Sequence, residues 1–505
     1  MSGLSTRFPR WIFGAAVAIS LAYVPSLTTP FDFIDDGNLV YPAPPGTTLR
    51  GHIETWWSDV VANVNHLGPF RPTLWAHWHL QANLFGADPF LWRLYRLVWV
   101  ALAAGMLLWL LRELRVPAPT AIFATAAAMW NPYRGEIWTS LTLSEGVAMP
   151  YAIFALVAAR RGATANRPWM WDLAGMACAL VALGCKNTFA AIVPAQIVLR
   201  MWPDGLALRE AIRQNTLRCV LLSFSLALPV VHFIYFKLNW HAGQYQPPGP
   251  NFAQLGRMLS GLKGAMGMDF LGAGIAAAVA CSARGFAVLR EYRAALLCGA
   301  VLTAAGIVVY LPMDMMSGRY TLPAAWGLDI LFALLLTAVL RTSIGWRRTA
   351  TWVVLIVGLI AVLCACVHRQ EKFQARARML WDVVHHIETT APPNATIAWK
   401  TGDTARGELG VEEGIHMQWH LARRGRSDVR IALLDSDEQP VSRVELAPAD
   451  GKALFRIVAG EGKDRQGWET DRSFSVKYQF GRKRFGCHVS RLDVASVRAP
   501  GGNDR

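Results

Sequence analysis

Residues 31–38 read F-D-F-I-D-D-G-N, and they follow a long uncharged stretch. No charged side chain occurs in residues 11–31, a stretch long enough to cross a bilayer as a helix, and Asp32, Asp35 and Asp36 follow. The pattern predicts carboxylates held at a membrane face. A carboxylate near an apolar interface and beside a second negative charge has a raised pKa, which suits a general base. The alternative is that the aspartates merely end an apolar helix.

The composition indicates a membrane protein. Hydrophobic residues make up 53% of the 505 residues and charged residues only 17%. The net charge of +15 would suit a nucleic-acid partner, but the basic residues fall between apolar segments, where they orient helices and contact anionic lipid headgroups. Membrane lipid is therefore an expected partner and nucleic acid is not. All cysteines except Cys487 lie in or next to apolar segments, which predicts no disulfide framework.

The fold class expected from the apolar segments is mainly α and polytopic, with about eleven transmembrane helices. Lys186 separates two of these segments, which we interpret as two helices because the basic stretches flanking the pair belong on one side of the membrane. Arg93 and Arg96, near the start of the second segment, are expected to snorkel toward the interface. The expected spans are about 11–27, 91–111, 117–130, a fourth ending at 159, 169–185, 187–202, 219–236, 270–283, 294–311, 320–340 and 349–367.

The expected domains are a transmembrane domain, 1–367, and a small soluble α/β domain, 368–505. The first outer loop is long, about 30–90, and residues 72–85 resemble a helix lying in the interface. Alternate connectors are rich in arginine, which places the N-terminus in the cytoplasm and residues 368–505 outside it. We therefore expect a multi-pass protein of a bacterial inner membrane. The opposite, outer side carries the opening aspartates with Glu54, Asp59, Asp88, Glu136, Asp269, Asp314, Arg71, Arg134, Lys186, Lys263 and Arg319.

The tail after residue 368 has apolar runs of strand length. They lie at 396–399, 429–434, 453–458 and 474–480, and residues 409–424 read as an amphipathic helix. On that helix Glu412, His416 and His420 recur every four residues and share one face. This spacing could hold a metal, although a solvated helix face explains it as well.

Several motifs follow one another along residues 10–340. They are the acidic pair Asp35-Asp36, the element Gly68 to Pro72 (G-P-F-R-P) with the turn Leu84 to Phe90 (L-F-G-A-D-P-F), Asn131 to Trp138 (N-P-Y-R-G-E-I-W), the lysine turn Gly184 to Asn187, and Arg319 to Ala324 (R-Y-T-L-P-A). Together they resemble the GT-C superfamily of integral-membrane glycosyltransferases, which use polyprenyl-phosphate-linked sugars. The family often has an acidic residue directly after the lysine of the lysine turn, where this chain has Asn187.

The resemblance implies roles for these residues. Transfer from a lipid phosphate needs a base for the acceptor hydroxyl and cations for the departing phosphate. Asp35 or Asp36 is the implied base, and the other holds the loop or a divalent cation, a cofactor that the sequence neither requires nor excludes. Lys186 and Arg319 are the leading phosphate ligands.

Arg71 and Arg134 are further substrate-binding candidates, ranked after Lys186 and Arg319. The alternative for each is a topology determinant or a headgroup contact. Glu145 lies inside an apolar segment, where a carboxylate is costly, so it is expected to line the cavity and to orient an acceptor or Arg134. Asp329 is expected to pair with a polar group of a neighbouring helix, for which His232 is one candidate.

The function implied is transfer of a sugar from a polyprenyl-phosphate donor to a glycan, lipid or protein acceptor at the extracytoplasmic face. Two alternatives remain open from the sequence. A transporter or lipid-linked sugar flippase would also combine many spans with buried carboxylates, and an outer-face polysaccharide polymerase or ligase would share the substrates.

Overall fold

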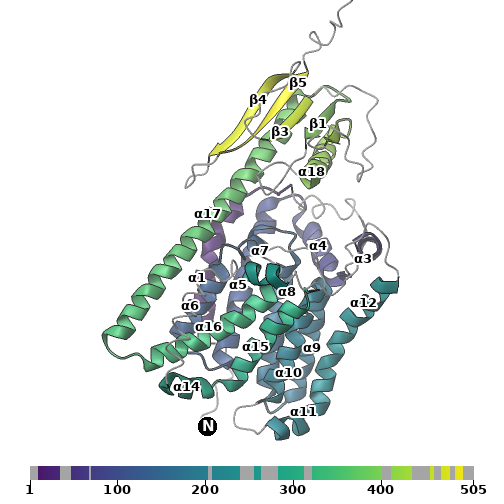
Figure 1. The fold of residues 1–505 in the computed structure, drawn as a ribbon. Coiled ribbons are helices and arrows are strands. Elements are labelled where there is room, and N and C mark those ends of the chain that lie inside the picture. Colours follow the sequence, from purple (N-terminus) through teal and green to yellow (C-terminus); the bar gives the residue numbers. More distant parts are fainter. Residues whose placement is uncertain are drawn as a thin grey trace, which may run out of the picture. The chain divides into compact units, whose positions relative to one another are not determined.

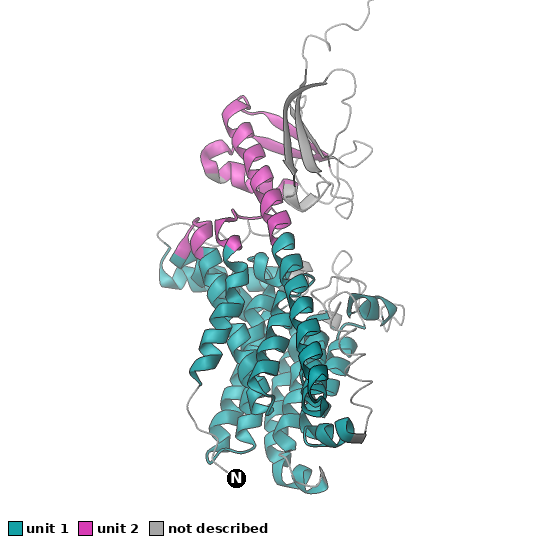
Figure 2. Cartoon of the chain, turned by 90° about the vertical axis from the view of Figure 1, so that its left-hand side faces the viewer, with its two compact units in different colours: residues 1–24, 42–84, 92–369 teal, residues 25–41, 85–91, 370–505 magenta. Residues whose placement is uncertain are grey.

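The chain folds into two compact units, which Figure 2 shows in different colours. Unit 1 comprises Met1–Val24, Pro42–Leu84 and Trp92–Arg369, and unit 2 comprises Pro25–Tyr41, Phe85–Leu91 and Gln370–Arg505. The structure is a computed structural model that describes residues 9–33, 47–67, 70–202, 208–238, 255–262, 283–311, 321–400, 411–434, 455–459, 468–477 and 484–492.

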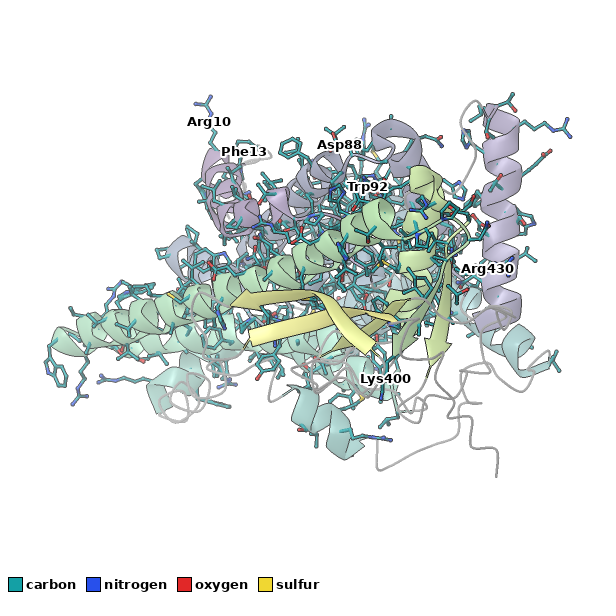
Figure 3. The ribbon with its side chains drawn as sticks, turned by 90° about the horizontal axis from the view of Figure 1, so that it is seen from above. Arg10, Phe13, Asp88, Trp92, Lys400 and Arg430 are labelled. Atoms are coloured by element: carbon teal, nitrogen blue, oxygen red, sulfur yellow. The ribbon has the colours of Figure 1, made fainter. Side chains whose placement is uncertain are left out.

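Unit 1 is built of helices that lie side by side (Figure 1). Trp92 is fully buried among them, whereas Arg10 and Phe13 of the first helix point outward (Figure 3). The helices are α1 (Arg10–Ser20), η1 (Leu21–Thr28), α3 (Leu49–Leu67), α4 (Pro72–Phe85), α5 (Pro89–Glu113), α6 (Ala118–Trp130), α7 (Glu136–Thr139), α8 (Ser144–Gly162), α9 (Pro168–Cys185), η2 (Asn187–Ala191), α10 (Ile192–Met201), α11 (Leu208–Ser223), η3 (Phe224–Leu226), α12 (Ala227–Leu238), α14 (Ala283–Arg290), α15 (Arg293–Val308), α16 (Leu322–Thr342) and α17 (Trp346–Thr390), of which η1, α4, α5 and α17 continue into unit 2.

Six of the described helical segments are long and apolar enough to cross a membrane, and the bent pair α14 and α15 would make a seventh. The mainly helical membrane fold expected from composition is therefore confirmed. Residues 270–282 of the predicted span 270–283 lie outside the described residues, so the count of eleven stays a prediction. Within unit 1, α16 is central, with 83% of its apolar window buried, whereas only 6% of the α17 window is buried.

The basic connectors of unit 1 meet at one end of the helices. We call this end the basic end. The connectors after α5, α8, α10, α14 and α16 lie there. The expected gathering of these connectors on one side is confirmed, while their orientation in a membrane stays a prediction. Four contacts join them: Arg161–Glu113 at 2.7 Å, Arg200–Asp172 at 2.6 Å, Arg341–Glu291 at 2.9 Å, and the Tyr292 hydroxyl donating to the Arg115 carbonyl oxygen at 3.3 Å.

The chain reverses direction at Lys186, as the sequence predicts. Lys186 has extended backbone angles (φ −161°, ψ 123°) between α9 and η2. After it, α10 runs back along α9, because Arg200 near the end of α10 forms an ion pair with Asp172 near the start of α9. Gly175 permits the close approach of α9 and α10, because a Cβ at this position would lie 2.9 Å from Nε2 of Gln196 on α10. The 18 residues of α9 rise about 27 Å, so Lys186 lies at the end of unit 1 opposite the basic end.

Unit 2 contains a mixed five-stranded sheet in the order β2-β1-β3-β5-β4. β1 pairs in parallel with β2 and β3, and β5 pairs antiparallel with β3 and β4. The parallel β1–β2 connection contains α18 (Val411–Leu421). The strands are β1 (Thr396–Lys400), β2 (Arg430–Leu434), β3 (Phe455–Ala459), β4 (Trp468–Lys477) and β5 (Arg484–Leu492).

The core of unit 2 lies between the sheet, the last turns of α17 and α18. Gly414 lets α18 pack closely on β1 and β2, because a Cβ there would overlap Leu433 and come within 3.0 Å of Trp399. His416 and His420 are each only 3% exposed, so the alternative of a solvated histidine face is wrong. The described residues contain no group of side chains that could hold a metal, and the Glu412 side chain lies outside them.

Candidate functional site

Some of the expected site residues fall outside the described part of the chain. They are Asp35, Asp36 and Arg319, together with the outer-side residues Lys263, Asp269 and Asp314. Asp32 is described and is 3% exposed, and its Oδ1 accepts a hydrogen bond from the Phe33 backbone N–H at 2.8 Å. The roles assigned to the aspartate pair and to Arg319 therefore stay predictions.

Lys186 and Glu145 form a buried ion pair at the chain reversal. Lys186 Nζ donates to Oε1 of Glu145, and the residues are 7% and 1% exposed. Glu145 lies in the first turn of α8, where the helix dipole favours a negative charge. Loss of either partner from a buried pair leaves an uncompensated charge and costs about 3–5 kcal/mol. Glu145 therefore holds the Lys186 ammonium in place.

The Tyr310 ring lies beside the ammonium group and is itself held by Thr188. Lys186 Nζ lies 6.0 Å from the centre of the Tyr310 ring, within range of a cation–π interaction. The Tyr310 hydroxyl is 2.8 Å from Oγ1 of Thr188, which is in η2 just after the lysine. The residues just after α15 and the start of η2 are thereby joined beside the cation.

The start of α4, which follows the Arg71 motif, meets the same turn. A Cβ at Gly184 would overlap Oγ1 of Thr73 and would lie 3.1 Å from the Thr73 Cβ, so the start of α4 packs directly on the lysine turn. Arg71 lies two residues before Thr73. Its Nε is buried and makes no hydrogen bond within the described part of the chain. The contact places the Arg71 motif beside the Lys186 motif.

Arg134 forms a bidentate pair with Asp329 instead of lying open. Its Nη1 and Nη2 donate to the two carboxylate oxygens of Asp329 at 2.6 and 3.1 Å, and the residues are 2% and 5% exposed. Asp329 was expected to pair with a polar group of another element, and that group is Arg134. The His232 side chain, the candidate named from the sequence, lies outside the described residues. The pair ties the N-P-Y-R-G-E connector to α16, and substrate binding by Arg134 stays a prediction.

Arg93 and Arg96 turn inward, so the expectation that they snorkel is wrong. They are 1% and 5% exposed and donate to the backbone carbonyl oxygens of Thr139 and Leu141, respectively. Irregular backbone buried between apolar helices needs such donors, because an unpaired carbonyl is costly there. These arginines hold the segment that leads from α7 into α8 and therefore position Glu145.

A histidine–aspartate pair that the sequence analysis did not identify joins α3 to α4. Nε2 of His79 lies 2.8 Å from Oδ2 of Asp59, and His79 is 4% exposed. The two residues are on separate helices, and nothing in the local sequence pattern indicates that they meet. The pair fixes α3 against the helix whose first turn contacts Gly184.

Comparison with known proteins bears on the fold alone. A search with protein-family models and a search of curated sequences found no match. The chain is similar to solved structures of ArnT. The match to ArnT from Cupriavidus metallidurans in the apo state has a TM-score of 0.47 and 14% sequence identity, and it covers 85% of this chain and 86% of ArnT.

Two further structures show weaker similarity. The same ArnT bound to undecaprenyl phosphate matches with a TM-score of 0.44 and 13% identity, covering 97% of this chain and 99% of ArnT. Archaeal oligosaccharyltransferase AglB from Archaeoglobus fulgidus, in complex with an inhibitory peptide and a dolichol-phosphate, matches with a TM-score of 0.39 and 11% identity, covering 76% of this chain and 58% of AglB.

Proposed function

We propose that this chain is an integral-membrane glycosyltransferase of the GT-C type, which transfers a sugar from a polyprenyl-phosphate donor to an acceptor at the extracytoplasmic face. The observation that carries the proposal is the meeting of motifs around one buried cation. Thr73, directly after the Arg71 motif, packs on the turn that presents Lys186, and Glu145 pairs with that lysine. These residues are far apart in sequence and lie opposite the basic end.

The cations of this region suit a departing phosphate. Lys186 carries an ammonium group with three N–H donors, the type of group that binds a phosphate oxygen, and Glu145 accepts from it. Because Glu145 cancels the charge of Lys186, the net positive charge that attracts an anion comes from a second cation. Arg71, with a buried Nε that lacks a hydrogen bond in the described chain, is the best candidate, and Arg319 is the other.

The proposed reaction is a displacement at the anomeric carbon. Asp35 or Asp36 accepts the proton of the acceptor hydroxyl as its oxygen forms a bond to that carbon. The bond from the carbon to the phosphate oxygen breaks at the same centre, and its electron pair stays on the polyprenyl phosphate. Lys186 and Arg71 stabilise the negative charge that grows on that oxygen. A divalent cation held by one aspartate would supply further charge stabilisation.

The decisive experiment compares two aspartate variants with a neighbouring control. Asp35→Asn and Asp36→Asn remove a carboxylate base but keep the size of the side chain. We expect one of them to lower transfer from a polyprenyl-phosphate sugar by about 10²–10⁴-fold, the usual contribution of a general base, and the other to lower it partly. Asp32→Asn is the control, because an amide oxygen can still accept from the Phe33 N–H.

The measurement has two arms on the same preparations in liposomes. One arm follows the loss of the lipid-linked sugar from extracted polyprenyl phosphates, and the other measures binding of undecaprenyl phosphate by native mass spectrometry. Binding should persist in both aspartate variants, since the phosphate and tail hold the donor. Wild-type transfer in the double variant Asp35→Asn/Asp36→Asn would overturn the catalytic role of the pair.

A further inference from the structure

Three buried N–H groups along one side of α4, counted from the residue before its first turn, have no acceptor. They are Nε of Arg71, Nε1 of Trp75 and Nε1 of Trp78, and none has a hydrogen-bond partner in the part of the chain that the structure describes. Positions 71, 75 and 78 are spaced four and three residues apart, so they share one face of the helix. A buried donor without an acceptor is costly, because it has given up its hydrogen bond to water.

The unpaired indoles lie on elements that contact the lysine turn. Trp99 on α5, in contrast, donates to the Val147 carbonyl oxygen at 3.1 Å. Trp326 on α16 is 2% exposed, and its Nε1 also has no acceptor among the described residues. Its ring centre lies 5.6 Å from that of Phe189 in η2, which follows the lysine directly. Unsatisfied donors are therefore found next to the proposed phosphate site.

The same side of α4 also offers an acceptor. Nε2 of His79 lies 2.8 Å from Oδ2 of Asp59, so in the neutral ring the proton is assigned to Nε2 and Nδ1 is left as an acceptor. This Nδ1 is buried and has no hydrogen-bond partner in the described chain. The ring centre of Trp75 is 6.5 Å from that of His79 and 5.1 Å from that of Trp78. Neighbouring donors and an acceptor suit hydroxyl groups, which can both accept and donate.

The row begins at a cation of the proposed phosphate site. Thr73, on the first turn of α4, packs on Gly184 of the lysine turn, and Arg71 lies two residues before it. Trp75 and Trp78 follow Arg71 by about 6 Å and about 10 Å along the helix axis. A group bonded directly to a phosphate at Arg71 can therefore reach both indoles. In the donor this group is the sugar, whereas the polyprenyl tail has no oxygen to accept from an indole N–H.

We propose that Trp75, Trp78 and His79 bind the sugar of the polyprenyl-phosphate donor. The proposal rests on the proposed function and assigns residues to recognition of the sugar. The indole N–H groups donate to sugar oxygens, and Nδ1 of His79 accepts from a hydroxyl. A sugar that lacks a matching oxygen leaves a buried donor unpaired and is rejected. Lys186 and Arg71 bind the phosphate that all such donors share, and α4 selects the sugar.

The test removes the donors while keeping aromatic rings. Trp75→Phe and Trp78→Phe each delete one N–H, and native mass spectrometry measures dissociation constants for undecaprenyl phosphate alone and for undecaprenyl phosphate carrying glucose, mannose or N-acetylglucosamine. We expect the wild-type protein to bind at least one sugar-bearing lipid more tightly than the bare lipid. Each variant should weaken binding of that lipid about 3-fold to 10-fold, the usual contribution of one hydrogen bond, and change binding of the bare lipid less than twofold. The double variant should show no preference.

A matched control and a stability measurement separate recognition from folding. Trp109→Phe removes an indole N–H that donates to Glu113 at the basic end, so the preference for the sugar-bearing lipid should stay at the wild-type value. Without ligand, Trp75→Phe and Trp78→Phe should keep the wild-type Tm, because their N–H groups have no acceptor in the described chain. A fall in Tm in both variants would place the acceptors inside the protein and overturn the proposal.

The binding data give three further decisive outcomes. A preference that persists in the double variant, or a wild-type protein that binds no sugar-bearing lipid better than the bare one, would overturn the proposal while leaving the proposed function in place. A raised KM for the acceptor substrate, with donor binding unchanged, would assign the indoles to the acceptor and overturn it as well. Absence of transfer in the wild-type protein would instead refute the proposed function.

Discussion

At the scale of single residues, the pairing of Lys186 with Glu145 determines how the lysine can be tested. Lys186→Met alone leaves a buried carboxylate without its partner, and we expect it to lower the free energy of unfolding by about 3–5 kcal/mol. The double variant Lys186→Met/Glu145→Gln removes both charges and should recover most of that stability. Transfer should stay low in both, because the phosphate loses a cation in each.

Thermal unfolding and transfer, measured on the same detergent preparations, distinguish the loss of stability from the loss of phosphate binding. A double variant that regains both stability and turnover would show that Lys186 is structural. A useful comparison is Arg341→Gln at the basic end, where the ion pair is exposed and contributes little, so that both quantities should stay close to wild type.

His416 predicts a pH dependence for unit 2. Burial lowers the pKa of its imidazole from 6.5 to about 4, so folding favours the neutral ring. The resulting stability is present above pH 6.5 and is lost as the pH falls from 6.5 toward 4. Between pH 7.5 and pH 5 the loss is about 2 kcal/mol. Hydrogen exchange of α18 in the whole protein measures it, and His416→Gln should flatten the profile.

The residue scale also shows what the sequence can predict. Lys186, Arg71 and Glu145 were identified from local motifs, and the structure brings Glu145 and the start of α4 to the lysine turn. Their partners were not predictable, because Glu145 and Lys186 are separated by most of two helices. The inward direction of Arg93 and Arg96 was missed because the carbonyl oxygens that they bind belong to a later connector.

At the scale of elements, the helices with clear boundary signals were predicted well. Residues 72–85 coincide with α4, which begins at Pro72 and is followed by Gly86 at φ +53°. Proline at the first helical position and glycine just after the last are both readable in a sequence. β5 was missed, because Gly486 and its basic residues obscure the alternation expected of a strand.

The contact between α4 and the lysine turn gives a prediction about packing. Gly184→Ala should displace Thr73 and lower stability by about 1–3 kcal/mol, with a fall in turnover because Arg71 moves with the start of α4. Adding Thr73→Ala to Gly184→Ala removes Oγ1 of Thr73, the atom nearest to the new Cβ, and should partly restore stability and turnover. Gly14→Ala is the matched control, since a Cβ there meets nothing within 4 Å. Thermal unfolding and transfer assays report both effects, and equal behaviour of Gly184→Ala and Gly14→Ala would contradict the prediction.

At the scale of the whole molecule, the basic end predicts the orientation in the membrane. Connectors rich in arginine remain on the cytoplasmic side, so residues 368–505 should be outside the cytoplasm. A reporter that is active only in the cytoplasm, fused after Arg505, should stay silent, and the same reporter placed after Gly345 should be active. A strong signal from the C-terminal fusion would reverse the assignment and separate the proposed site from an outer-face reaction.

The buried arginines of α5 have a consequence for biogenesis. A ribosome makes Arg93 and Arg96 before it makes Thr139 and Leu141, whose carbonyl oxygens they bind in the finished fold. Until then α5 offers two charged groups to any lipid around it, which disfavours its release from the translocation channel. We therefore expect α5 to leave the channel together with α6 and the α7 connector, as one inserted unit, instead of entering the bilayer on its own.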